Sequence, residues 1–174
     1  MKRLICLVLY YGLARYLPHT ASKFGGKISK KIRYSLCKNI FKYCGKNVNI
    51  ERLAWFGTGK DIEIGDNSGI GINAKVYNNV KIGKNVMMGP NCYMLESTHL
   101  YDRVDIPMRE QGRKQYRDKV IIGDDVWIGR DVLILGSKEI KTGSIIGARC
   151  VLTKNFPEYS IVGGNPSKLI RSRK

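Results

Sequence analysis

An aliphatic side chain returns at every sixth position over two long stretches of this chain. The positions are Ile64, Ile70, Val76, Ile82, Met88 and Met94, and then Ile122, Ile128, Ile134, Ile140, Ile146 and Leu152. A helix repeats after about 3.6 residues and a pleated strand after about two, so a period of six fits neither element alone. It fits a short strand followed by a tight turn. Three such units then form one coil of a triangular solenoid.

Small and turn-forming residues keep the same period. A small or β-branched residue lies four positions after most of the aliphatic ones: Ser68, Ala74, Val80, Val86, Cys92, Val126, Val132, Ser144 and Cys150, whereas Lys138 breaks the pattern. Asparagine recurs at positions 67, 73, 79, 85 and 91, and glycine often follows the aliphatic residue. Both residue types suit turns with positive φ. We therefore expect aliphatic side chains in a narrow core, small ones at its corners, and asparagine and glycine in the turns.

Several motifs occur in a fixed order along these stretches. They are Met88–Asn91, Ser97–His99, Ile122–Gly129, Ile146–Ala148, Val151–Lys154 and Ile161–Lys168. In this order they resemble the hexapeptide-repeat acyltransferases, in particular the maltose, galactoside and polysaccharide O-acetyltransferase branch, over roughly residues 60 to 171. The resemblance implies a left-handed parallel β-helix, a homotrimer and acetyl-CoA as the acyl donor.

The predicted fold is therefore mainly β. We expect a left-handed β-helix acyltransferase domain at residues 47–171, with an excursion loop at 99–119 that protrudes from it and a short C-terminal helix. A basic amphipathic helical segment at residues 1–46 precedes this domain. The loop is polar, and long excursions from a rigid scaffold often carry function.

The N-terminal segment begins with Lys2 and Arg3, followed by an apolar run from Leu4 to Ala14. That run is too short to cross a bilayer, which takes about 20 residues. No convincing small-residue cleavage site follows it, so we expect a retained helix and not a signal peptide.

A second helix is predicted from about Lys27 to Tyr43. One face of it carries Ile28, Ile32, Leu36 and Ile40, and lysines flank that face. No acidic residue precedes Glu51. Two interpretations stay open and are compatible: the basic segment lies on an anionic membrane surface, or its apolar face covers the open end of the β-helix.

Charge and rare residues narrow the function classes. A net charge of +17 favours anionic partners such as phosphates or anionic lipid, but no nucleic-acid recognition motif is present. The five cysteines form no CxxC pair and are odd in number, which indicates reduced thiols in the cytoplasm. With only two histidines, we expect no metal site. The expected location is the cytoplasm, with peripheral contact at the inner face of the membrane as the further hypothesis.

Acyl transfer to an alcohol needs a base for the hydroxyl proton, and imidazole titrates near neutral pH. His99 lies where the repeat gives way to the loop, and it matches the catalytic histidine of the family. The resemblance also assigns Asn73 to the acceptor hydroxyl, which it would face from across the subunit interface, although asparagine is common at turns of this repeat. Glu96 either orients the imidazole, binds the acceptor, or is a solvated surface acid.

The donor site is implied by the resemblance alone. Trp127 would line the pantetheine channel, unless it packs between subunits, and backbone groups of Gly129 and Ala148 would bind the pantetheine amides. Cationic and polar residues would meet the adenine and phosphate end of the donor: Thr153, Lys154, Lys168 and Arg171. Arg130 departs from the family, where serine or alanine is common, and would narrow the channel or bind phosphate.

The main hypothesis is an acetyl-CoA-dependent O-acetyltransferase that modifies a sugar hydroxyl in polysaccharide or lipid-linked glycan biosynthesis. Two alternatives remain. One is an acetyltransferase for a small acceptor such as a free sugar, an antibiotic or serine. The other is a non-catalytic solenoid that binds anionic partners.

Overall fold

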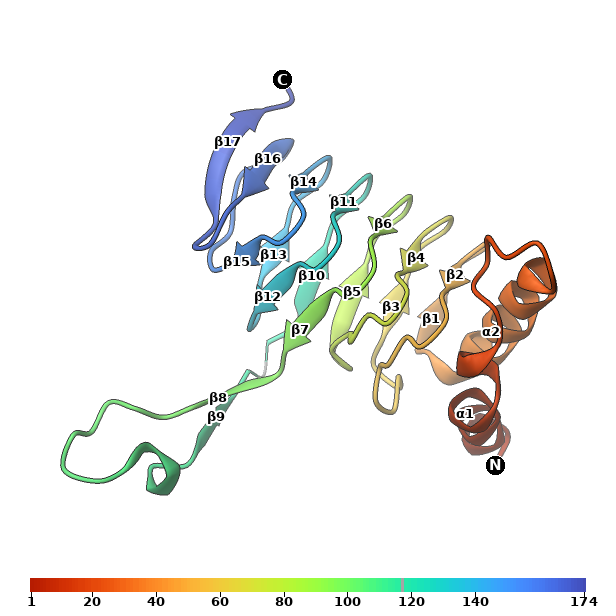
Figure 1. The fold of residues 1–174 in the computed structure, drawn as a ribbon, viewed down its shortest axis with the longest axis horizontal. Coiled ribbons are helices and arrows are strands. Elements are labelled where there is room, and N and C mark those ends of the chain that lie inside the picture. The colour runs from red at the N-terminus through yellow and green to blue at the C-terminus, as the bar shows by residue number, and fades with distance from the viewer. Residues whose placement is uncertain (117) are drawn as a thin grey trace.

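The computed structural model describes residues 1–116 and 118–174, which form a parallel β-helix with helices at its N-terminal end (Figure 1). The helical elements that come first are α1 (Lys2–Gly12), the 3-10 turn η1 (Ala14–Tyr16) and α2 (Gly26–Ile40). The remaining chain climbs away from them in stacked coils and ends at the far end of the solenoid (Figure 1).

Three ladders of short parallel strands form the three faces of the solenoid. The first face contains β1 (Tyr43–Cys44), β3 (Glu63–Ile64), β5 (Val80–Ile82), β10 (Val120–Ile122) and β13 (Glu139–Ile140). The second contains β2 (Asn49–Ile50), β4 (Gly69–Ile70), β6 (Met87–Met88), β11 (Trp127–Ile128), β14 (Ile145–Ile146) and β16 (Ser160–Gly163). The third contains β7 (Tyr93–Leu95), β12 (Leu133–Leu135) and β15 (Val151–Leu152), and bridges at Trp55 and Lys75 extend it.

The six-residue period predicts this core correctly. On the first face Ile64, Ile82, Ile122 and Ile140 stack in register, and all four are buried. The predicted corner residues, among them Ser68, Ala74, Cys92 and Cys150, are also buried. Each coil therefore closes over the previous one with the same small set of side chains.

Most of the repeated asparagines occupy left-handed turns, as expected. Asn67, Asn73, Asn85 and Asn91 have φ between 53° and 58°, whereas Asn79 is not among the positive-φ residues. Their amides also bond between coils. The Asn73 amide donates to the Asn91 side chain at 3.0 Å, and the Asn91 amide donates to Asp131 at 2.9 Å.

The predicted excursion is a hairpin arm that projects from the solenoid (Figure 1). Its antiparallel strands are β8 (Ser97–His99) and β9 (Arg113–Gln115), with η2 (Met108–Glu110) between them, and position 117 lies outside the described residues. At the base of the arm, Lys119 contacts Glu63 at 2.9 Å, and Lys42 contacts the same carboxylate at 3.0 Å. Hydrogen bonds from Lys119 and Lys42 lower the pKa of Glu63 to about 2.

The predicted C-terminal helix is wrong. Residues Lys168–Ser172 form a strand, β17, which pairs antiparallel with β16. The outer edge of β16 presents unpaired backbone groups, and the chain returns along that edge after the turn at 164–167. The pairing satisfies those groups and ends the ladder of the second face.

The predicted inner face of the second helix is wrong for Ile28 and Ile32, although Leu36 and Ile40 do pack against the core. The buried residues of α2 are Gly26, Ser29, Arg33, Cys37 and Ile40, while Ile28 and Ile32 are exposed. The cause is Arg33, which is fully buried and whose guanidinium donates to the carbonyls of Ile50 at 2.5 Å, Pro18 at 3.1 Å and Leu17 at 3.2 Å. The helix does cover the first coil, but with a different stripe.

The domain division at residues 46 and 47 stays a prediction. The strand β1, at Tyr43–Cys44, already pairs with β3 of the solenoid. The helices are joined to the coils by further bonds: the Tyr10 hydroxyl donates to the Ala54 carbonyl at 2.9 Å and packs on Phe56.

We expect Arg33→Ala to lower the free energy of unfolding by about 3 kcal/mol, because it leaves buried carbonyls and Glu51 without their cationic partner. Urea denaturation measures the change. The matched control is Arg52→Ala at an exposed position, with an effect within about 0.5 kcal/mol. Equal effects of the two substitutions would contradict this role of Arg33.

Candidate active site

The candidate base, His99, is an exposed residue on the arm. It ends β8, opposite Arg113 on β9. Glu96 lies at the base of the arm, where burial raises the pKa of its carboxyl. Burial and the nearby Glu96 carboxyl also raise the pKa of the Tyr77 hydroxyl, which bonds to the Tyr116 carbonyl. Glu96 therefore borders the core, and His99 lies farther out on the arm.

Asn73 lies at another corner of the solenoid. It follows β4 of the second face and precedes Lys75 of the third, whereas the arm leaves after β7, between the third and first faces. Its amide is bonded to Asn91, and its φ of 53° makes it a turn residue. One chain therefore does not bring Asn73 and His99 together, and the structural role of Asn73 is visible whereas its catalytic role stays a prediction.

Trp127 belongs to an outward-facing column on the second face. It is 51% exposed, and it is in register with Met87 on one side and Ile145 on the other. Ile161 continues the column on β16 and is paired with Arg171 on β17. The column is thus an apolar strip that begins near the middle of the solenoid and ends at a basic strand.

A corner of small residues runs beside this column. Gly71, Gly89 and Gly129 stack on successive coils, and Ala148 lies next in line. A methyl group added at Gly129 would lie 2.6 Å from the backbone nitrogen of Ala148. The Gly129 N–H already donates to the Ile146 carbonyl at 2.8 Å, so this N–H is occupied by the fold. The corner is therefore made largely of backbone.

The remaining predicted donor residues gather at the C-terminal coils. Lys154, Lys168 and Arg171 are exposed, and the Thr153 N–H donates to the Ser167 hydroxyl at 3.0 Å. Arg130 lies at the next turn, where its guanidinium bonds to Asp131 at 3.2 Å. Arg130 thus has a structural partner in its own chain, while the two β17 cations face outward.

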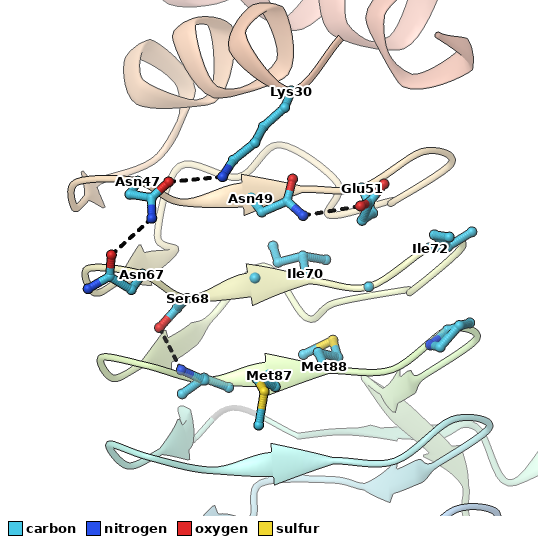
Figure 2. Close-up of a pocket in the computed structure, with 14 residues that line it drawn as sticks. Lys30, Asn47, Asn49, Glu51, Asn67, Ser68, Ile70, Ile72, Met87 and Met88 are labelled. Atoms are coloured by element: carbon cyan, nitrogen blue, oxygen red, sulfur yellow. Dashed lines mark hydrogen bonds between the residues drawn. The ribbon is translucent and has the colours of Figure 1, made fainter. Parts of the chain in front are cut away.

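A cavity of about 380 Å³ lies on the same face, between α2 and the coils that hold Met87 and Met88 (Figure 2). Lys30 donates to Asn47 at 2.9 Å, Asn47 to Asn67 at 3.0 Å, and Asn49 to Glu51 at 3.1 Å. Burial acts to raise the pKa of Glu51, but hydrogen bonds from Thr20 and Asn49 outweigh it and leave this pKa below its usual value. The cavity therefore carries amides and one carboxylate.

This cavity is not among the sites that the sequence predicts. The available signal was the alternation of Asn47, Asn49 and Glu51, which puts three polar side chains on one side of a strand. The contribution of α2 could not be read from that pattern, because the helix presents a face other than the predicted one. Among the described residues, no group of three His, Cys, Asp or Glu side chains could hold a metal ion.

The fold is similar to those of solved acetyltransferases. A galactoside acetyltransferase solved in complex with coenzyme A is 30% identical, with a TM-score of 0.78 over 99% of this chain and 81% of that one. The chain belongs to the hexapeptide-repeat acyltransferase family. A maltose O-acetyltransferase from Clostridium difficile 630 is 25% identical, with a TM-score of 0.75 over 99% and 87% of the two chains. The fold class, a left-handed parallel β-helix, is thereby confirmed.

Sequence comparison matches shorter stretches of this hexapeptide-repeat acyltransferase. The family model described as bacterial transferase hexapeptide (six repeats) matches residues 61–95. A chloramphenicol acetyltransferase from Agrobacterium fabrum is 47% identical over 53 residues, 30% of this chain and 25% of that protein. The alignment therefore spans about a quarter of the relative's length.

We expect Gly129→Ala to destabilise the protein by about 2 kcal/mol, because the added methyl group meets the backbone of Ala148. Thermal or urea unfolding measures this cost. Gly12→Ala is the control, since a methyl group there meets nothing within 4 Å, and it should be neutral or slightly stabilising. A neutral Gly129→Ala would show that the stacked corner can open at little cost.

Proposed function

We propose that this protein is an acetyl-CoA-dependent O-acetyltransferase that acts on a sugar hydroxyl. The observation that carries the proposal is the second face of the solenoid. There an apolar column containing Trp127, a backbone-lined corner at Gly129 and a basic strand lie side by side. The coenzyme A bound in the related galactoside acetyltransferase structure supports the donor.

The order of features along this face matches the order of groups in the donor. Coenzyme A has phosphates at one end, a long apolar and amide-bearing arm, and a thiol at the other end. Lys168 and Arg171 on β17 would bind the phosphates, as cations do. The arm would then follow Ile161, Ile145 and Trp127 toward the cavity near Met87. The Gly129 carbonyl accepts from the buried Cys92 thiol at 3.2 Å and its N–H donates to Ile146, so Gly129 would let the arm approach closely but would not hydrogen-bond it.

Catalysis would require more than one chain. His99 is on an arm that leaves between the third and first faces, while the donor would lie along the second. A neighbouring chain would therefore supply the histidine to each donor face, which fits the homotrimer expected from the family. Light scattering tests this assembly.

In the proposed reaction, the His99 imidazole removes the proton of the acceptor hydroxyl as its oxygen attacks the thioester carbonyl. The bond from carbonyl carbon to sulfur then breaks, and the thiolate takes the proton back from the His99 imidazolium as coenzyme A leaves, which regenerates the base. Glu96, whose raised pKa reflects burial, would position the arm or bind the acceptor. The products are an acetyl ester and free coenzyme A.

The cavity in Figure 2 would bind the acceptor. The cavity presents the amides of Asn47, Asn49 and Asn67 and the carboxylate of Glu51. Amides donate to hydroxyl groups and accept from them, and a carboxylate accepts from them, so this lining suits a polyol. We propose a glycan acceptor in polysaccharide or lipid-linked glycan biosynthesis. The proposed location is the cytoplasm, with peripheral contact at the inner face of the membrane.

A second candidate is acetyl transfer to a small acceptor. The similarity to a chloramphenicol acetyltransferase favours it. Turnover of acetyl-CoA with free sugars, chloramphenicol, serine and lipid-linked glycans, measured in parallel, distinguishes the two candidates.

We expect His99→Ala to lower kcat by about 10²-fold or more, because the acceptor proton loses its base, while the trimer persists. Release of free thiol from acetyl-CoA measures the rate. His19→Ala is the control, because His19 is the other histidine in the sequence and is exposed. An unchanged rate for His99→Ala would remove the proposed base.

We expect Trp127→Ala to weaken coenzyme A binding about tenfold, because the donor arm loses a large apolar contact. The fold should persist, since the side chain is half-exposed. Ile121→Ala changes an exposed outward position on the first face and should leave coenzyme A binding unaltered. Equal affinities of the two variants would count against a donor path along the second face.

A further inference from the structure

The first 32 residues hold a disproportionate share of the exposed apolar surface. Among the described residues, 21 large hydrophobic side chains are exposed, and ten of them lie at positions 1–32. On α1 they follow one stripe, which contains Leu4, Ile5, Val8 and Leu9 and is continued by Leu13 just after the helix. The opposite side, Cys6 and Tyr10 with Ala14 of η1, is buried against α2 and the first coil. The outer face of α1 is therefore apolar and lies away from the core.

The α2 helix and the connection before it carry further exposed apolar side chains. Ile28 and Ile32 are exposed because Arg33 holds the neighbouring stripe of the helix against the first coil, and Phe24 is exposed just before the helix. Exposed lysines lie on the same two helices and their connection: Lys2, Lys23, Lys27, Lys31 and Lys38. We call the exposed apolar residues of 1–32 together with these lysines the helical end surface.

The basic residues of this segment divide into two groups by position. The arginines point inward: Arg3 donates to the carbonyls of Ile40 and Thr58, Arg15 to that of Leu53, and Arg33 to that of Ile50. The lysines of the helical end surface remain at the exterior. No acidic residue occurs in the first 50 positions to compensate them. The surface is therefore both apolar and uniformly cationic.

We propose that the helical end surface docks the protein on an anionic lipid bilayer, with the outer stripe of α1 in the interface and the lysines at the headgroups. A helix that lies in the interface combines an apolar face with lysine-rich flanks, and each lysine near an anionic surface adds attraction. No described helix is long and apolar enough to cross a membrane. The proposal refines the membrane contact proposed above and does not depend on acetyl transfer.

Docking by this end would orient the whole solenoid. The helices lie at one end, and β17 with its basic residues lies at the other (Figure 1). The cavity borders α2 through Lys30, so it lies toward the membrane end (Figure 2). If the proposed function holds, an acceptor carried on a lipid would meet the cavity beside the bilayer, and the donor phosphates would bind far from the anionic headgroups.

The test is sedimentation of the full-length protein with vesicles of phosphatidylcholine alone or of phosphatidylcholine with phosphatidylglycerol. We expect binding to the anionic vesicles that falls as salt rises, and little binding to the neutral ones. Val8→Gln should weaken binding to anionic vesicles about tenfold. The matched control, Val104→Gln, changes an exposed valine on the arm and should bind like the unmodified protein.

The charge contribution has its own pair of variants. Lys31→Glu should weaken vesicle binding by about tenfold or more, and Lys81→Glu, at an exposed position on the first face, should not. Retained coenzyme A binding and an unaltered unfolding midpoint show that each variant is folded. Failure of the unmodified protein to sediment with anionic vesicles at low salt would overturn the proposal. So would equal losses in the variants and their controls, or a change of oligomeric state in Val8→Gln, which would identify a second copy of the chain as the occupant.

Discussion

The structure depends on the register between successive coils. Each coil adds one rung to three parallel ladders. The register is kept although paired residues lie 18 positions apart in the regular coils, 20 apart at the helical end and 40 apart where the arm is inserted. The six-residue period enforces this by placing an aliphatic side chain, a small corner residue and a left-handed turn at equal intervals. The register of the paired strands fixes the outward-facing side chains as well as the inward-facing ones. It therefore also aligns Met87, Trp127, Ile145 and Ile161 on the outside of one face. The proposed donor path is thus a by-product of the core pattern.

The sequence predicts the coils well because the six-residue repeat is a local pattern with a direct structural cause. The sequence-based prediction fails where a single long-range contact determines which residues are buried. The apolar stripe of α2 has a clear helical periodicity, yet Arg33 takes the inward position because the carbonyl of Ile50 in the first coil and those of Leu17 and Pro18 need donors. A hydrophobic stripe could not satisfy them. The same contact leaves Ile28 and Ile32 exposed and so creates the helical end surface.

The candidate site is predictable in part for a related reason. Trp127 and Gly129 belong to the repeat, so their register could be expected, and His99 could be found as a histidine at the edge of the excursion. The strand β17 could not, because its pairing depends on the free edge of β16 and not on local propensity. The separation of Asn73 from His99, which lie at different corners of one chain, follows only from the family resemblance, which places Asn73 across a subunit interface. A site formed by residues of two chains produces no characteristic spacing of those residues within one sequence.

The central claim is that the outer second face of the assembled protein binds the acyl donor. Isothermal titration of acetyl-CoA into the unmodified protein, after light scattering has established its oligomeric state, tests this most directly. We predict saturable binding with one acetyl-CoA per chain in a trimer. No binding by a confirmed trimer would mean that the fold is retained without donor chemistry, and the solenoid would then have to be regarded as a non-catalytic surface for anionic partners.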